Sequence, residues 1–234
     1  MHLFLLQVIA DSAQIKDSLI RAAQLAAQQK ESLIDILVKG GPLMIPLAIL
    51  LVIAIFVFFE RYIAISRASK LEDNFMNIIR DNITTGNVAA ARNLAKNTPT
   101  AVARIIDKGI QRVGKPIVDI ERSMENIGKL ELYKMEKNLA ILSAIAYLGP
   151  LFGFLGTIFG MFELFYAIAS TGEYSISNIA AGIYVKMISS AAGLIIGIVA
   201  YVGYRFLNSQ IDKTTNKMEA ASADFVDILL EEAR

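Results

Sequence analysis

Three long stretches of the chain contain hydrophobic residues and no charged ones. These stretches, which lack Asp, Glu, Lys and Arg, are residues 42–59, 139–162 and 187–204. Each reaches the roughly 18 apolar residues that a helix needs to cross the hydrocarbon of a bilayer. The pattern predicts an all-α membrane protein with three transmembrane helices, at 41–65, 139–170 and 179–207.

The segment between the first two spans, residues 66–138, is polar and carries charges of both signs. It predicts a helical insertion that is divided into short helices by Gly86, Asn97, Pro99, Gly114 and Pro116. Beyond Pro116, steps of three and four link Ile120, Met124, Ile127, Leu130, Lys134 and Lys137. This spacing predicts one helix from about 117 to about 170, so that the second transmembrane helix extends beyond the membrane.

The last segment, residues 208–234, continues the third span in the same way. A seam with steps of four and three is formed by Ile211, Thr215, Met218, Ser222, Phe225 and Leu229. This spacing is typical of a helix that packs against another helix. We therefore expect the third helix to run from about 179 to 232, with about half of it outside the membrane.

The orientation follows from the basic residues. The turn at 171–178 contains no Lys or Arg, whereas the opposite flanks of the spans are rich in both. The positive-inside rule then places the N-terminus and the turn outside, and the insertion and the C-terminus in the cytoplasm. The first ten residues lack the basic start of a secretion signal, so we expect them to be retained. Residues 1–40 otherwise predict a periplasmic amphipathic segment on the membrane surface, or a loosely ordered polar tail.

Composition excludes several functional classes. Hydrophobic residues make up 55% of the chain and charged residues 19%, and the net charge is +1. There is no cysteine, and the single histidine is His2. The chain lacks a basic reading helix, a phosphate-binding loop, a nucleophile motif and a metal-spaced carboxylate set. We expect no enzyme activity, no cofactor, no metal and no nucleic-acid partner.

The second and third spans each have one face of small residues. These helix-packing candidates are Gly149, Gly153, Gly156, Gly160, Gly182, Gly193 and Gly197. Small residues let membrane helices approach closely, and hydroxyls in such helices either bond to the backbone or mark a polar pathway. The first span is bulky on all sides, which predicts that it lies outermost in the assembly, against lipid.

Polar residues of the two glycine-containing spans come in pairs at similar depth. Relative to position 174, Thr157 lies 17 residues before the turn and Ser190 lies 16 after it. Glu163 lies 11 residues before it and Lys186 lies 12 after it. Because an isolated charge in a bilayer is costly, we expect Glu163 and Lys186 to pair or to contact water, within or between subunits. Whether they form a structural pair or handle ions directly stays open.

Two segments resemble signatures of the ExbB/TolQ/MotA proton-channel family. They are LGPLFGFLGTIFG at 148–160 and AGIYVKMISSAAGL at 181–194. The order of one span, a long insertion, two spans and a tail is similar to the family layout as well, and the likeness is greatest to its biopolymer-transport branch. One position departs from the family pattern: Val185, followed by Lys186, occupies a place where an acidic residue is common.

The resemblance implies a proton-conducting motor, or stator, subunit of the bacterial inner membrane. It implies a ring-forming homo-oligomer, a pentamer, around an ExbD-like single-span partner that carries an essential Asp. Protons would reach that Asp along Thr157, Ser190 and the neighbouring Ser189. The proton motive force would then drive a TonB-like force transmitter and energise TonB-dependent outer-membrane transport. The alternatives are a TolQ-like or gliding-type stator subunit, and a non-conducting membrane scaffold.

Overall fold

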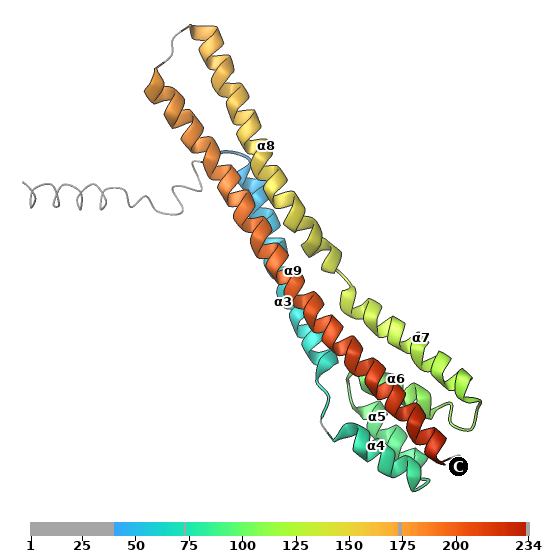
Figure 1. The fold of residues 1–234 in the computed structure, drawn as a ribbon. Coiled ribbons are helices and arrows are strands. Elements are labelled where there is room, and N and C mark those ends of the chain that lie inside the picture. The colour runs from blue at the N-terminus through green and yellow to red at the C-terminus, as the bar shows by residue number, and fades with distance from the viewer. Residues whose placement is uncertain (1–39, 73, 173–174, 233–234) are drawn as a thin grey trace, which may run out of the picture. The chain divides into compact units, whose positions relative to one another are not determined.

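The structure is a computed structural model that describes residues 40–72, 74–172 and 175–232. In this part of the chain all regular structure is helical (Figure 1). The helices are α3 (Met44–Ser69), α4 (Phe75–Thr84), α5 (Val88–Asn97), α6 (Ala101–Ile110), α7 (Ile117–Glu136), α8 (Leu139–Thr171) and α9 (Ile176–Glu232). The expected amphipathic segment at 1–40 lies outside the described residues, apart from Gly40.

Three helical stretches are long and apolar enough to cross a membrane. They begin at Met44, Ile117 and Ile179, and the charge-free part of the second one lies within α8. The three expected spans therefore correspond to α3, α8 and α9, and the first was expected to begin three residues before α3 does. The chain divides into two compact units, and both α8 and α9 contribute to each of them. Among the described residues, one unit consists of residues 40–44 and 156–190, and the other of residues 45–155 and 191–232.

The insertion folds into three short helices before α7, and its predicted breakers are confirmed. Gly86 and Gly114 adopt left-handed backbone conformations, with φ of 74° and 88°, in the turns that follow α4 and α6. Asn87 and Thr100 cap the next helices, accepting hydrogen bonds from the backbone N–H groups of Ala90 and Ala103. These caps satisfy N–H groups that a helix leaves without an internal partner.

The core of the insertion lies where α6, α7 and α9 meet. A Cβ atom added at Gly109 of α6 would lie 2.6 Å from Phe225 of α9 and 2.7 Å from Met124 of α7. All three residues are buried. The missing side chain of Gly109 therefore makes the space that the Phe225 ring fills, and it fixes the position of α9 over the insertion.

The seam along the end of α9 differs in phase from the predicted one. Its buried residues are Ile211, Thr214, Met218, Ala221, Phe225, Ile228 and Leu229. Thr215 and Ser222 are only half-buried, so their assignment to the seam was wrong by one position. The steps run three and then four rather than four and then three. Both phases share Ile211, Met218, Phe225 and Leu229, which is why spacing alone did not separate them.

The expected continuous helix from 117 to 170 was also wrong at one point. α7 ends at Glu136 and α8 begins at Leu139, and Asn138 between them has a left-handed backbone with φ of 65°. Asparagine tolerates this conformation better than most residues, because its short polar side chain bonds locally. A helix break without Gly or Pro has a weak sequence signal, so the second transmembrane helix has a separate extension rather than a continuous one.

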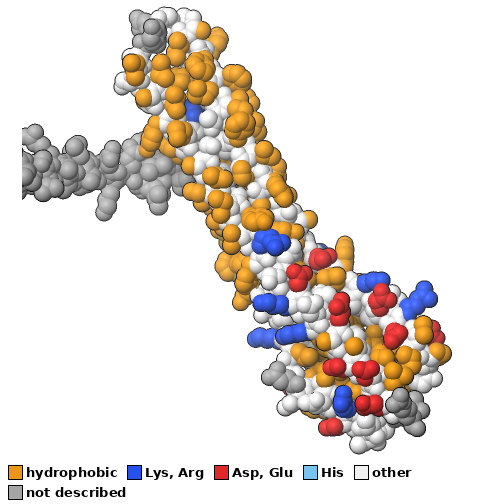
Figure 2. Space-filling model, in the orientation of Figure 1, with side chains coloured by type: hydrophobic (Ala, Val, Ile, Leu, Met, Phe, Trp, Pro, Cys, Tyr) orange, Lys and Arg blue, Asp and Glu red, His pale blue; other side chains and the backbone are white. Residues whose placement is uncertain are grey.

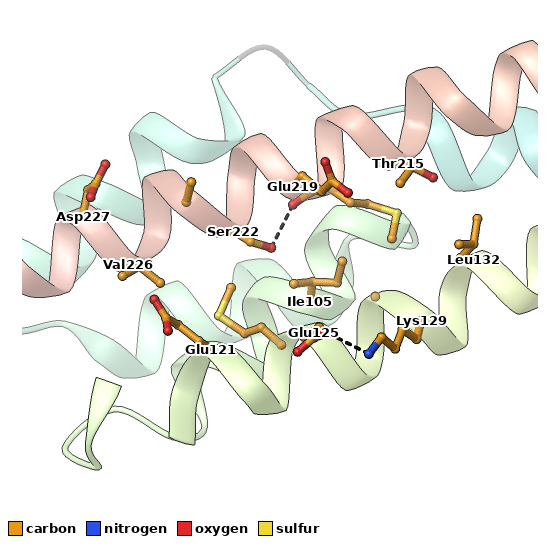
Figure 3. Close-up of a pocket in the computed structure, with 14 residues that line it drawn as sticks. Ile105, Glu121, Glu125, Lys129, Leu132, Thr215, Glu219, Ser222, Val226 and Asp227 are labelled. Carbon is orange, nitrogen blue, oxygen red and sulfur yellow. Dashed lines mark hydrogen bonds and ion pairs between the residues drawn. The ribbon is translucent and has the colours of Figure 1, made fainter. Parts of the chain in front are cut away.

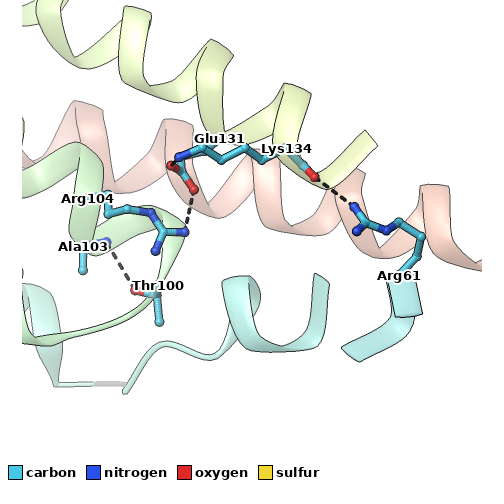
Figure 4. A network of polar contacts seen from close by, with 6 residues as sticks. All are labelled: Arg61, Thr100, Ala103, Arg104, Glu131 and Lys134. Carbon is cyan, nitrogen blue, oxygen red and sulfur yellow. Dashed lines mark hydrogen bonds and ion pairs between the residues drawn. The ribbon is translucent and has the colours of Figure 1, made fainter. Parts of the chain in front are cut away.

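The α7 face that packs inward contains a carboxylate. Glu131 is 2% exposed, whereas Leu130, which the spacing placed on the inner face, is 47% exposed. Arg104 of α6 donates to Glu131 at 2.5 Å and Lys134 donates to it at 2.7 Å. Arg61 of α3 in turn donates to the backbone oxygen of Lys134 at 3.2 Å (Figure 4). One buried carboxylate thus links α6 and α7, and Arg61 of α3 bonds to the α7 backbone beside it.

Charged side chains gather in the part of the surface formed by α4–α7 and the end of α9. Hydrophobic side chains cover most of the remaining visible surface (Figure 2). Those of α3 include Val52, Phe56 and Phe59, each more than half exposed in the single chain. This distribution fits three apolar helices in a bilayer and a charged helical region in water.

We predict that Glu131→Gln lowers the free energy of unfolding by about 1–3 kcal/mol, because a charge-assisted hydrogen-bond pair is lost. Burial alone would raise the pKa of Glu131, but hydrogen bonds from Arg104 and Lys134 outweigh it and hold that pKa below its ordinary 4.5. The stability that the ionised Glu131 carboxylate gives to the folded state is therefore complete above pH 4.5. It is lost as the pH falls through the lower pKa that Glu131 has in the folded state.

Thermal unfolding of the detergent-solubilised protein checks this prediction. The difference in unfolding temperature between wild type and Glu131→Gln should be largest at neutral pH and should become smaller below pH 4.5. Glu125→Gln is the matched control, because Glu125 also pairs with a lysine of α7 but is exposed, and it should change little. A gap that is constant with pH would contradict the assigned role of the Glu131 charge.

Candidate functional site

The backbones of α8 and α9 come into direct contact in the unit that contains Ile45–Leu155 and Ala191–Arg234. A Cβ atom added at Gly193 would overlap the backbone oxygen of Gly149 and would lie 2.8 Å from the Cα atom of Gly153. One added at Gly197 would lie 2.5 Å from the ring of Pro150. Side chains cannot fit between these groups, so glycine is required on both sides of this contact.

The other unit contains a similar contact between α8 and α9. A Cβ atom added at Gly156 would lie 2.5 Å from the hydroxyl oxygen of Ser189, and Ser189 is 1% exposed. The Ser189 hydroxyl donates to the backbone oxygen of Lys186 at 2.9 Å, one turn back along α9. Ser189 is therefore enclosed within the chain, an arrangement that favours a packing role for it over the polar pathway expected from the sequence.

Thr157 and Ser190 directly follow the two residues of this contact. Because Gly156 meets Ser189, the next residue along each helix lies at nearly the same level. Neither side chain is enclosed as Ser189 is, since Thr157 and Ser190 are both half-buried. One residue along a helix is a rotation of about 100°, which turns both hydroxyls away from the centre of the α8–α9 contact.

The two charged residues of the same unit lie together. Lys186 Nζ is 3.0 Å from Glu163 Oε2. A Cβ atom added at Gly160 would overlap the aliphatic part of Lys186, so this glycine provides the space through which the lysine crosses α8. Glu163 is 75% exposed in the single chain and Lys186 is 26% exposed. The carboxylate is thus on the outer surface of the helix pair, where lipid or another copy would contact it.

Two packing contacts between α8 and α9 had no clear signal in the sequence. Pro150 packs on Gly197, and Gly160 makes room for Lys186 rather than for another helix backbone. Gly182 faces the side chain of Leu164 at an ordinary to tight distance. Spacing shows which residues share a face, but it does not show which side chain fills the space a glycine leaves.

The described residues contain no group of three or more His, Asp or Glu side chains that could hold a metal ion. The candidate site consists of two apolar helices in close contact. The hydroxyls of Thr157 and Ser190 lie at one level along these helices, and the Glu163–Lys186 ion pair lies at a different level. A polytopic helical membrane protein of this kind can conduct ions or assemble with other helices. The chain belongs to the MotA/TolQ/ExbB proton channel family, whose pattern matches residues 97–220.

Individual relatives agree with this assignment. The chain is 34% identical over 100 residues to biopolymer transport protein exbB1 of Vibrio cholerae, covering 42% of this chain and 43% of that protein. It is 29% identical over 185 residues to ExbB-like 1 of Synechocystis, covering 77% and 72%. It is 26% identical over 106 residues to the Tol-Pal system protein TolQ of Haemophilus influenzae, covering 45% of each chain.

The chain thus spans less than half the length of the Vibrio and Haemophilus relatives in these comparisons. With its three apolar helices, the family membership indicates a protein of the bacterial inner membrane that belongs to a channel family rather than to a known class of enzymes.

We predict that Gly193→Leu destabilises the chain by about 3 kcal/mol, because the new side chain meets backbone atoms that cannot rotate away. Ala191→Leu, at an exposed position on the same helix, should be nearly neutral. Thermal unfolding and the yield of monodisperse protein in mild detergent measure both effects. Equal losses at the two positions would contradict the assignment of Gly193 to the helix contact.

The Glu163–Lys186 pair predicts a non-additive result. Glu163→Gln leaves the ammonium group of Lys186 without its partner, and Lys186→Met leaves the carboxylate alone, so each single change should lower the unfolding temperature. The double variant should recover part of the loss. The corresponding double-mutant cycle on Glu125 and Lys129, an exposed pair of α7, should show effects on the unfolding temperature that are close to additive. An additive cycle at Glu163 and Lys186 would show that the pair contributes nothing to stability.

Proposed function

We propose that this chain is the proton-conducting subunit of an inner-membrane motor. In this proposal, copies of the chain form a ring, a pentamer, around an ExbD-like single-span partner with an intramembrane Asp. The proton motive force drives the complex, which acts through a TonB-like force transmitter to energise TonB-dependent outer-membrane transport. Family membership and the biopolymer-transport relatives support this choice among membrane functions.

The observation that carries the proposal is the position of Thr157 and Ser190. They lie at one level of the α8–α9 pair, beside the enclosed Gly156–Ser189 contact and outside it. Neither hydroxyl titrates near neutral pH, so neither can be the site that binds the proton. Two hydroxyls at one level can hold a short chain of water molecules in an otherwise apolar passage, next to a carboxylate on a partner helix.

The partner supplies the titrating group in this scheme. Val185 stands where an acidic residue is common in the family signature, and Lys186 beside it is paired with Glu163. Each of these two charges is matched by the other across α8 and α9, which suits a structural role. We therefore assign Glu163 and Lys186 to holding the outer ends of α8 and α9 together, and the proton-binding step to the partner's Asp.

The proposed orientation has a periplasmic N-terminus and turn, with α4–α7 and the end of α9 in the cytoplasm. It is supported by the basic residues on that side, among which are Arg67, Lys134 and Arg205. The proposed ring is supported by the many large apolar side chains that α8 and α9 expose in the single chain, such as Phe154, Phe159 and Ile195. Neighbouring copies and lipid would cover them.

A TolQ-like role in the cell envelope is the second candidate function, since a Tol-Pal system protein is among the relatives. It uses the same proton pathway and differs in the force transmitter. The non-conducting scaffold is a different class, in which Thr157 and Ser190 would serve packing alone, as Ser189 does through its bond to the backbone. The experiment below separates conduction from scaffolding.

We predict that Thr157→Val slows proton-coupled work several-fold and that the double variant Thr157→Val, Ser190→Ala reduces it by about 100-fold. General losses of 10–100-fold are typical when a polar group that positions reacting partners is removed. The measurement is proton flux into proteoliposomes that contain the chain with its co-purified single-span partner, together with TonB-dependent nutrient uptake in cells with normal complex levels.

Ser143→Ala is the matched control, because Ser143 is a half-buried hydroxyl residue of α8 far along the helix from Thr157. Flux and uptake should remain close to wild type in this variant. Wild-type flux in the double variant would falsify the assignment of Thr157 and Ser190 to the pathway. Lost uptake with normal flux would instead show that the chain conducts protons but drives a different transmitter.

A further inference from the structure

A groove of about 620 Å³ lies between α7 and the end of α9, within a single unit of the chain. Its walls are residues of these two helices, and Ile105 of α6 lies between them (Figure 3). The volume falls in the range of about 300–1,000 Å³ that is common for binding sites. Gly128 of α7 and Ala223 of α9 contribute to the space, because neither has a large side chain.

The interior of this groove is apolar and adaptable. Ile105, Met124, Leu132, Met218 and Val226 all line it. Unbranched methionine side chains change conformation easily and are common where a surface accepts partners of varied shape. Ile105, Met124 and Met218 are buried at its base, whereas Leu132 and Val226 are half-buried. Apolar surface that polar residues surround marks an interaction site.

The residues around the apolar part are mainly acidic. Glu121 and Glu125 come from α7, and Glu219 and Asp227 come from α9, whereas Lys129 is the one basic lining residue. Lys129 is already paired with Glu125 at 2.7 Å. Within the described residues, no ion pair neutralises the other three carboxylates. The groove therefore has a surplus of negative charge around an apolar centre.

One hydroxyl group that lines the groove lacks a hydrogen-bond partner in the described part of the chain. The Oγ1 atom of Thr215 is inaccessible to water and has no hydrogen-bond partner in the described part of the chain. By contrast, the hydroxyl of Ser222 donates to the backbone oxygen of Met218 at 2.8 Å. An unsatisfied buried polar atom costs free energy, so the wall of the groove is not optimally packed at Thr215.

We propose that this groove binds a basic amphipathic helix of another protein. Apolar side chains on one face of that helix would fill the space over Met124 and Met218. Lysine or arginine residues beside them would lie against Glu121, Glu219 and Asp227. Helix-in-groove binding of this type needs an apolar groove and complementary charge around it, and both are present here. The residues that line the groove do not include Thr157 or Ser190, so the groove would serve recruitment or regulation rather than conduction.

The chain contains no cysteine, so a single cysteine is a unique reporter. Full-length Ala223→Cys, labelled with a benzophenone and held in neutral-lipid nanodiscs, is illuminated with synthetic peptides of about three helical turns. The basic probe has leucine on one face and lysine on the other; the acidic probe has glutamate in place of lysine. We expect at least about tenfold more crosslinked product from the basic probe.

Two matched controls define the site. The reporter Leu130→Cys lies on α7 outside the groove and should give little product with either probe. In the Ala223→Cys background, Glu121→Gln with Asp227→Asn should reduce the basic product about tenfold. Asp119→Asn with Asp224→Asn removes the same charge from exposed positions of the same two helices outside the groove, and it should not.

Three results would overturn the proposal. Equal product from basic and acidic probes, or equal product at the two reporters, would show that binding is not set by the groove. Crosslinks between two copies of the chain in place of peptide adducts would show that a neighbouring subunit covers the groove. Loss of proton flux in the Thr157 and Ser190 variants does not bear on this test, so the two proposals stand or fall separately.

Discussion

The close approach of α8 and α9 is the constraint on which the rest of the structure depends. At Gly149 and Gly193 the two helix backbones meet without room for a side chain. Lipid offers no hydrophobic driving force between apolar helices, so their association relies on close packing of this kind. In the other unit the two helices also meet closely, since Gly156 contacts Ser189 and Lys186 crosses Gly160 to reach Glu163.

The helices outside the apolar spans are held by a different interaction. Glu131 is buried between Arg104 and Lys134, and Arg61 of α3 donates to the backbone oxygen of Lys134. A buried carboxylate is stable only with such partners, because removing a charge from water is costly. It therefore specifies how α6 packs on α7 more strictly than apolar contacts do, since an exchange of neighbours would leave the charge unpaired.

Sequence patterns predicted the elements well and their details less well. Three uncharged stretches and the Gly and Pro breakers were enough to place the helices, because water-free hydrocarbon and left-handed turns admit few alternatives. The break at Asn138 and the burial of Glu131 were missed, since both depend on partners distant in sequence. The α9 seam was shifted at Thr215 because two phases of one pattern share most residues. At the candidate site, the spacing of the glycines indicated which face of each helix is small. Only the structure showed that Pro150 and Lys186 fill the space beside these glycines.

Consecutive serines on α9 show how the chain separates packing from any pathway. Ser189 is enclosed against Gly156 and bonded to its own backbone, whereas Ser190, one residue on, is turned away from that contact. The small-residue faces are thus used within each chain, to join α8 to α9. A passage in the proposed ring must then be lined by other faces of these helices, where Thr157 and Ser190 interrupt large apolar side chains. Sparse hydroxyls in an apolar lining hold few water molecules, so protons would pass only where a partner carboxylate completes the chain.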